Sequence, residues 1–520
     1  MALSDVTFIR GEGGLGRPLA GKDHYSGILG YIADDDLPSG FSTSSRIKQV
    51  FSLEGAEALG IVNDWSDETK ATGGQAVITG AASVGTVVSL TITQPSTLNA
   101  LDETITLASY TVATGDAAAD IASALVTAVN NRTSIHGYSA SLDTATVELT
   151  APDGFGAIPN GQTIAYSDSS NATITQFTGG AGSYLSALWY HINTYFQKQP
   201  KGVLWIGLYT SGAFDGTGIS EMQQEANGEI RQLGIYLNGT ALATSQVTAI
   251  QAECDTLEEN HTPMSVILAS DVWGDSLSGL SDLSGLSSKN VSVATGQDGD
   301  NYGNFLANAL GYSVSDLGAL LGSVSFAKVN ESIAWVQKFN LASDVISVSN
   351  DDINIVSGTE FNLAGFSTGD LYKDQAVSLA ETVDSYHYIF QRTHVGEVGS
   401  FFQSSWTTIS ATSDYATIEN NRTIDKAVRN GRTFLLPKLN SPIFINSDGT
   451  LDEVTIKGFE NEVKRALSQL EVAQEISAYS VSIDPTQNVL SDSQIEVSIT
   501  IVPVGVTKFI DVNISYALNV

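Results

Sequence analysis

The residues that could bind a phosphate lie near the start of the chain, in RGEGGLGRPLAGKD (residues 10–23). Gly11, Gly13 and Gly16 fit the G-x-G-x-x-G pattern of dinucleotide-binding loops. The same stretch fits G-x-x-x-x-G-K up to Lys22, but Asp23 replaces the hydroxyl residue that ligates Mg²⁺. The strand pattern before the glycines is short, and no helical pattern follows them, although a Rossmann loop needs both. The sequence therefore favours a flexible glycine-rich segment over a nucleotide site.

A serine that could act as a nucleophile lies in GFSTG (residues 365–369), which matches G-x-S-x-G. Asp384 and then His387 or His394 follow in the chain order of an α/β-hydrolase triad. No HGGG-like oxyanion segment precedes the motif, and a chain rich in Gly, Ser and Thr matches so short a pattern by chance. The sequence therefore favours a loop, and no catalytic residue is predicted.

Carboxylates that could bind Ca²⁺ occur in GQDGDN (residues 296–301), but the spacing does not continue into an EF-hand. The six histidines form no H-x-x-x-H pair. The single cysteine, Cys254, lies on the apolar face of a predicted helix, as a small buried hydrophobe does. One cysteine excludes an intramolecular disulfide. No metal ligand and no cofactor are predicted.

The charge balance restricts the partners of this chain. It has 57 acidic and 24 basic residues, which give a net charge of −33. Nucleic-acid binding needs clustered Lys and Arg, so no direct nucleic-acid partner is expected. No apolar run approaches the roughly 18 residues of a membrane span, and MALSDVTF lacks the basic stretch of a secretion signal. We expect no membrane insertion, and synthesis in a cytoplasm without export.

The positions of strand and helix patterns divide the 520 residues into parts. Residues 1–40 are polar and glycine-rich and are predicted to form an N-terminal arm. Residues 41–72 plus 184–379 alternate apolar strands such as GVLWIGLY with helices, which predicts an α/β core. Residues 73–183 are rich in Thr, Ala, Ser and Gly, with short alternating runs and one helical stretch. They predict a mostly-β surface domain inserted into the core between two glycine pairs.

The last part of the chain mixes both patterns. Residues 380–507 are predicted to form an α+β domain whose strands include YSVSIDP and QIEVSITIVPV. Residues 508–520 alternate apolar and mostly polar positions, which predicts a C-terminal strand arm. Such a strand has to pair with a sheet edge in its own domain or in a neighbour. The expected fold class is α/β and α+β multidomain, with extended arms at both ends.

The C-terminal sequence resembles the C-terminal domain of contractile tail sheath proteins, from phages and related injection machines. The matching elements occur in order: the helix NNRTIDKAVR, the turn DGTL, an amphipathic helix over 457–475, the strand end SIDP, and IVPVGVTKFIDVNI. The resemblance covers residues 380–520 and, more loosely, 184–370. The insertion resembles Gly/Thr-rich modules that decorate phage surface proteins.

The resemblance implies a structural subunit rather than an enzyme. Such subunits polymerise as stacked hexameric rings around an inner tube and contract to drive the tube through a target envelope. The implied partners are neighbouring copies, the inner tube protein, and baseplate and terminal cap proteins. Assembly would take place in the bacterial cytoplasm, and the product would be a virion tail or an injection-system particle.

The resemblance also implies which residues make these contacts. The arms would donate strands to neighbouring subunits through Val6, Thr7, Phe8, Ile9, Phe509, Ile510, Val512, Ile514 and Tyr516. The helix over 457–475 would face the tube through Lys457, Glu460, Lys464, Arg465 and Gln469. A nucleotide-binding or serine-hydrolase enzyme, and a surface adhesin built on the insertion, are the alternatives.

Overall fold

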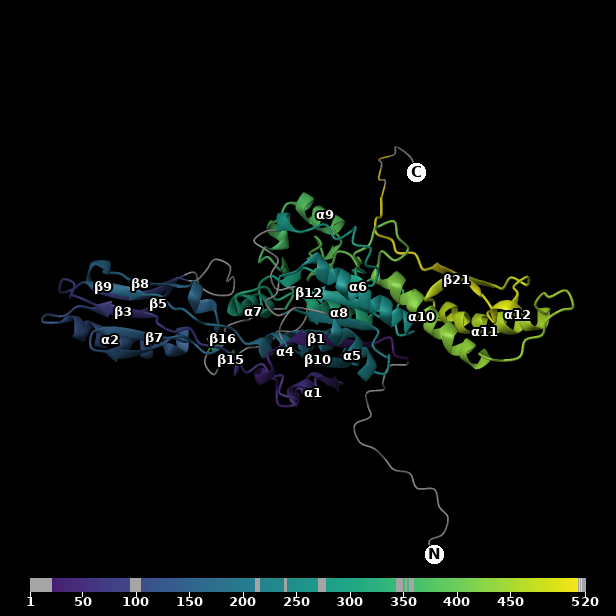
Figure 1. The fold of residues 1–520 in the computed structure, drawn as a ribbon. Coiled ribbons are helices and arrows are strands. Elements are labelled where there is room, and N and C mark those ends of the chain that lie inside the picture. Colours follow the sequence, from purple (N-terminus) through teal and green to yellow (C-terminus); the bar gives the residue numbers. More distant parts are fainter. Residues whose placement is uncertain are drawn as a thin grey trace, which may run out of the picture.

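A seven-stranded sheet forms the centre of the molecule (Figure 1). The computed structural model describes residues 21–93, 104–210, 216–237, 241–269, 277–342, 349–350, 353–354, 360–512, 514 and 516. The strand order is β18-β13-β12-β11-β1-β10-β2, and every neighbouring pair is parallel except β10 with β2. These strands are β1 (Tyr25–Tyr31), β2 (Ile47–Val50), β10 (Val203–Tyr209), β11 (Gln232–Tyr236), β12 (Ser265–Ala269), β13 (Val291–Ala294) and β18 (Tyr388–Ile389).

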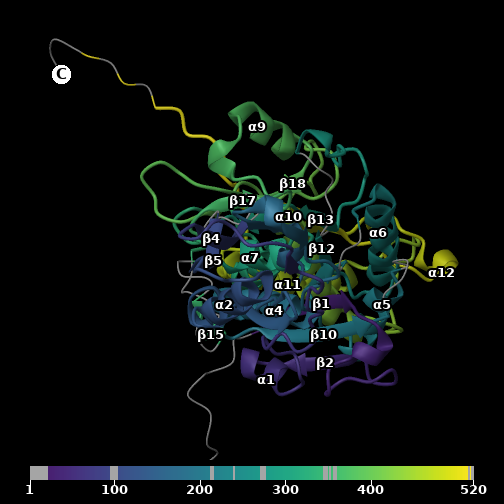
Figure 2. The same cartoon turned by 90° about the vertical axis from the view of Figure 1, so that its left-hand side faces the viewer.

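Helices cover both faces of this sheet, as the alternating patterns predict (Figure 2). Successive residues of a strand point to opposite faces, so Ile28 and Leu29 of β1 belong to two separate apolar clusters. The Ile28 cluster packs under α4 (Tyr184–Lys198), α7 (Tyr302–Leu310) and α8 (Leu317–Phe326). The Leu29 cluster packs under α5 (Thr217–Glu225), α6 (Thr244–Glu259) and α9 (Val377–Ser385).

The prediction that residues 1–40 form an arm is wrong from residue 25 onward. Strand β1 lies between β10 and β11 in the middle of the sheet. The glycines that suggested a loop are required by packing. A Cβ on Gly27 would crowd the Leu233 and Met222 side chains, and one on Gly30 would overlap the Tyr184 hydroxyl. Residues 1–20 lie outside the described residues.

Residues 75–93 and 104–175 build the lobe at the left of Figure 1. Its strands form two sheets, β6-β7-β3-β9 and β5-β4-β8, with the helix α2 (Ala118–Asn130) against them. The strands are β3 (Gln75–Ile78), β4 (Val87–Thr93), β5 (Thr104–Thr111), β6 (Ser139–Asp143), β7 (Thr146–Thr150), β8 (Thr163–Tyr166) and β9 (Ala172–Thr175). The two chain segments that join this lobe to the core bridge each other at Thr69 with Ala181 and at Thr72 with Thr178. A Cβ on Gly180 would overlap the Gly156 carbonyl, so this glycine allows close packing at the junction.

The predicted start of the C-terminal domain at residue 380 is also wrong. Strand β18 pairs in parallel with β13, so it belongs to the central sheet. The chain leaves the core only at α10 (Ile418–Leu435), which is followed by α11 (Glu453–Val472), β21 (Ile476–Ser482), α12 (Val489–Asp492) and β22 (Ser498–Pro503). The remaining elements are α1 (Leu53–Glu57), α3 (Thr133–His136), β14 (Gly296–Asp298), β15 (Ser349–Asn350), β16 (Ile353–Asn354), β17 (Ala364–Phe366), β19 (Gln391–Arg392) and β20 (Phe401–Phe402).

Candidate functional site

Strands β21 and β22 form a two-stranded antiparallel sheet at the end of the molecule opposite to the inserted lobe (Figure 1). The pairing runs from Ile476 with Pro503 to Ser482 with Ser498. A small apolar cluster holds the sheet on α10 and α11, and it consists of Ala427, Val463, Leu467, Leu470, Ile476 and Val481. Among the described residues each strand pairs only with the other, so both outer edges are open to a further strand.

The chain beyond Pro503 carries an exposed row of apolar side chains. The residues predicted to donate a strand at this end expose at least 72% of their surface, and they are Phe509, Ile510, Val512, Ile514 and Tyr516. The described residues from 508 onward form no strand within the single subunit. Exposed apolar side chains gathered in one place indicate a surface that another chain covers. The matching N-terminal residues Val6, Thr7, Phe8 and Ile9 lie outside the described residues.

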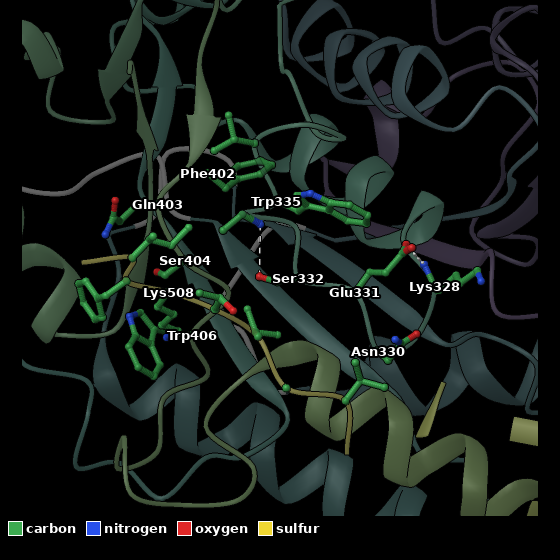
Figure 3. A pocket seen from close by; sticks show the side chains of 18 of the residues that line it. Lys328, Asn330, Glu331, Ser332, Trp335, Phe402, Gln403, Ser404, Trp406 and Lys508 are labelled. Atoms are coloured by element: carbon green, nitrogen blue, oxygen red, sulfur yellow. Dashed lines mark hydrogen bonds between the residues drawn. The ribbon is translucent and has the colours of Figure 1, made fainter. Parts of the chain in front are cut away.

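A cavity of about 1250 Å³ lies between the core and this C-terminal unit (Figure 3). Residues 328–336, which follow α8, form one wall, and residues 402–406 form another. Residues 504–510 of the chain beyond β22 line a further side of the cavity. Trp335 and Trp406 line it from two sides, as Figure 3 shows.

A partly buried cluster of charges joins the C-terminal unit to the core. The Lys426 ammonium on α10 lies 2.7 Å from an Asp23 carboxylate oxygen and 2.6 Å from one of Glu475. Arg422, one turn earlier, is 4% exposed and donates to the carbonyl oxygens of Asp23 and Ala327, both at 3.3 Å. Burial alone would raise the pKa of Asp23, but the charges of Lys426 and Arg429 outweigh it and lower that pKa.

The sequence alone did not predict this junction. Its only signal is the spacing of Arg422, Lys426 and Arg429, which places three cations on one face of a helix. Their partners lie about 400 residues earlier and about 50 residues later, and no local pattern identifies such partners. The junction connects the first described residues of the chain with α10 and with the residue before β21.

Helix α11 begins four residues before the predicted start at 457, because Asp452 caps it by accepting from the N–H groups of Val454 and Thr455. Of the residues predicted to face a tube, three are exposed, namely Lys457, Arg465 and Gln469. Glu460 is 7% exposed and accepts hydrogen bonds from Lys457 at 3.2 Å and Lys464 at 3.0 Å. The two lysines therefore cover the carboxylate and present the positive charge of this face.

The residues of the possible hydrolase do not form a triad. Ser367 is 4% exposed, and its hydroxyl lies 3.4 Å from the Gly296 carbonyl oxygen. Asp384 accepts from the indole N–H of Trp406 at 2.9 Å, and the His387 ring stacks on the same indole. Among the described residues, no hydrogen bond joins the side chains of Ser367, Asp384 and His387.

Two other residues named in the chemical motifs have structural partners. The Lys22 ammonium pairs with the Glu229 carboxylate. His394 packs against the Phe401 ring, with 5.6 Å between the ring centroids. Cys254 is buried, and burial raises the pKa of its thiol, so the thiol is not poised as a nucleophile.

GQDGDN forms β14 and the turn into α7. Asp298 is fully buried, and its carboxylate accepts the N–H groups of Asn301 at 2.6 Å and Phe361 at 2.7 Å. Asp316 lies against Gly296, accepts from the Gln391 amide at 2.8 Å, and has its pKa raised to about 7 by burial. The described residues contain no group of three acidic, His or Cys side chains that could hold a metal ion. Asp298 therefore caps backbone N–H groups in the core, and Asp316 accepts from a side-chain amide there.

Asp316→Asn is expected to stabilise the chain at pH 8 and to reduce the pH dependence of its stability. Between about pH 4 and pH 7 the folded state keeps a proton on Asp316 that the unfolded state has released. The free energy of unfolding therefore falls as the pH rises through this window and is level above it. The Asn amide does not ionise, so its burial carries no cost of a buried charge at pH 8. We therefore expect the free energy of unfolding to rise by about 1–3 kcal/mol at pH 8 and to change little below pH 4.

Urea unfolding at pH 4, 6 and 8 measures this effect. Asp35→Asn, at an exposed aspartate, is the matched control and is expected to leave the pH profile unchanged. An Asp316→Asn profile parallel to that of the wild type between pH 4 and pH 8 would contradict the assignment.

No helix in the described part of the chain combines the length and the apolar character that crossing a bilayer requires. A family model described as "DUF2586, C-terminal domain" matches residues 414–520, which begin just before α10. No curated protein sequence matches the chain.

Three solved structures illustrate the likeness to known folds. The sheath tail protein from Desulfitobacterium hafniense is 12% identical, with a TM-score of 0.35 over 96% of this chain and 100% of that one. The anti-feeding prophage helical sheath in its contracted state is 16% identical, with a TM-score of 0.42 over 63% of this chain and 81% of that one. The contracted PVC sheath complex of an extracellular contractile injection system is 12% identical, with a TM-score of 0.41 over 64% and 81%. All three are described as sheath proteins.

Proposed function

We propose that this chain is the subunit of a contractile sheath, and that copies bind one another by exchanging strands at the C-terminal sheet. The observation that carries the proposal is a two-stranded sheet with open edges, followed by a row of exposed apolar side chains from Phe509 to Tyr516. A strand from one subunit would complete the sheet of another through backbone hydrogen bonds, with its apolar side chains covered. The class of assembly is inferred from the resemblance of the C-terminal sequence to contractile tail sheath proteins.

The contrast with the inserted lobe supports this location for strand exchange. The edge strand β6 is covered, because the Asn130 side-chain amide both donates to and accepts from the Ala140 backbone at 2.8 Å. On β8, the Gln176 amide bonds the Ile164 N–H at 2.7 Å and its carbonyl oxygen at 3.1 Å. Covered edges resist pairing with other chains. Among the described residues of the C-terminal sheet and its connections, a side-chain amide makes this pair of bonds only before β22, where Gln487 bonds the Glu496 carbonyl oxygen at 2.9 Å and its N–H at 2.6 Å, and not along β21 or β22 themselves.

The proposed assembly has stacked hexameric rings around an inner tube, with baseplate and cap proteins at its ends. The inserted lobe and the β21–β22 sheet lie at opposite ends of the subunit (Figure 1), which suits an arrangement with the lobe outside and α11 against the tube. Lys457, Lys464 and Arg465 would then meet acidic groups of the tube protein. Contraction would move the assembly between two packings of the same subunits without a nucleotide. Assembly would occur in the bacterial cytoplasm and yield a virion tail or injection particle.

Electron microscopy of the expressed full-length protein, alone and with tube protein, tests the proposal. Uniform hollow tubes or rings are the expected result. A persistent monomer under both conditions would overturn it. Nucleotide affinity lost on Lys22→Ala, or hydrolase activity lost on Ser367→Ala, would favour an enzyme instead.

A further inference from the structure

The chain beyond β22 touches the core at Trp406. The Lys508 ammonium lies 3.5 Å from the centroid of the Trp406 ring, which is within the range of a close cation–π contact. In Figure 3 the two side chains lie together at the edge of the cavity, on the side away from Trp335. Lys508 is the last residue before the exposed apolar row begins at Phe509.

The core holds Trp406 ready for a cation. The His387 ring stacks on the indole at 4.4 Å between centroids and 2° between planes. A parallel ring at that distance fills one face of the indole, so the ammonium must occupy the other face. The indole N–H donates to Asp384 at 2.9 Å, which fixes the ring and places a carboxylate at its edge.

The partners of the tryptophan are themselves fixed by the fold. His387 is 2% exposed, has a φ of +65°, and its Nδ1 lies 2.9 Å from the Thr407 carbonyl oxygen. Asp384 lies in the last turn of α9, which packs on the central sheet. The aromatic face is therefore built by core elements, and the lysine comes from the segment that follows β22. The negative charges of Asp384 and Glu419 attract the Lys508 ammonium.

We propose that Trp406, backed by His387 and flanked by Asp384, is a lysine-ammonium binding site that pins the C-terminal arm to its own core through Lys508. The inference rests on the proposed function in one respect, since the arm beyond the pin is the strand offered to a neighbour. The contact between Lys508 and Trp406 determines where the free arm begins and the direction in which it leaves the subunit. An arm held at its root loses less freedom on pairing than one that swings freely from Pro503.

Trypsin cleavage after Lys508 in dilute, unassembled subunits tests the site. The protease must take the lysine side chain into its own pocket, so the bond is cut only when Lys508 leaves Trp406. Trp406→Leu is expected to speed this cleavage roughly tenfold, because loss of the cation–π contact raises the released population. Mass spectrometry of the C-terminal fragment measures the rate.

Trp335→Leu is the matched control, because Trp335 lines the same cavity without touching Lys508 and its replacement should leave the rate unchanged. Lys508→Arg keeps a cation and a trypsin site, so its cleavage should also be faster when Trp406 is changed to Leu. If circular dichroism finds Trp406→Leu unfolded, Trp406→Phe decides, with a smaller increase expected. A rate equal to the wild type in the folded Trp406 variant overturns the site. Tube formation is read separately by microscopy, so either proposal can fail alone.

Discussion

Deletion of residues 508–520 is expected to abolish assembly while leaving a folded, soluble subunit. The deleted segment begins outside the paired strands and contributes nothing to the apolar cluster under β21 and β22. Its apolar side chains are exposed in the subunit, and burying each one at an interface contributes about 1.5–3 kcal/mol. Their loss removes most of the free energy of strand exchange and little of the free energy of folding. Size-exclusion chromatography with light scattering and electron microscopy measure assembly, and circular dichroism measures folding.

Two sets of substitutions show whether assembly needs the apolar side chains of this segment or only its length. Changing the apolar positions 510, 512 and 514 to Ser should prevent assembly as the deletion does. The intervening residues, Asp511 and Asn513, are already polar. Changing both to Ser should therefore leave assembly intact. Tubes of wild-type diameter formed by the deletion variant would refute strand donation at this end.

The alternating patterns of the sequence predicted the α/β core and the C-terminal strands, because both have regular periods. GVLWIGLY is β10, and the two strands expected near the C-terminus form the β21–β22 pair. The central strand β1 was missed, since YSGILGY contains two glycines that resemble a loop. These glycines make room for side chains of α4, α5 and β11, and no local pattern carries that requirement.

Long-range charge pairing explains the other failure. The sequence placed the C-terminal domain boundary at residue 380, but β18 belongs to the central sheet and the physical junction lies at α10. That junction is made by Arg422 and Lys426 with Asp23. In the sequence around them, neither these cations nor Asp23 can be distinguished from charges that lie on the surface. Their burial depends on how the core and the C-terminal unit meet, which only the tertiary structure defines.

Arg422→Ala is expected to lower the free energy of unfolding by about 3 kcal/mol, the largest effect of any single substitution considered. The guanidinium is buried and satisfies carbonyl oxygens of Asp23, Ala327 and Lys328, which belong to two separate segments of the core. Alanine would remove the guanidinium from all three acceptors, although the Asp23 carbonyl oxygen keeps the Gln232 amide and the Lys328 carbonyl oxygen keeps the Glu331 N–H as donors. It would also leave the Asp23 carboxylate with less positive charge around it. The C-terminal unit would then separate from the core under milder conditions than the core itself unfolds. Urea unfolding followed by far-UV circular dichroism measures the change.

Arg432→Ala supplies the matched control, because Arg432 lies on the same helix and is exposed. It should change stability by no more than about 0.5 kcal/mol. Arg422→Lys keeps the charge but reaches fewer carbonyl oxygens, so its loss should fall between the two. If Arg422→Ala is as stable as Arg432→Ala, the junction does not hold the C-terminal unit on the core. The contacts that remain would then include the Lys426 ion pairs and the 3.2 Å hydrogen bond from Asn330 to the Gln474 carbonyl oxygen. If the buried arginine holds the junction, Arg422→Ala should show a first transition at low urea that involves only α10, α11 and their sheet.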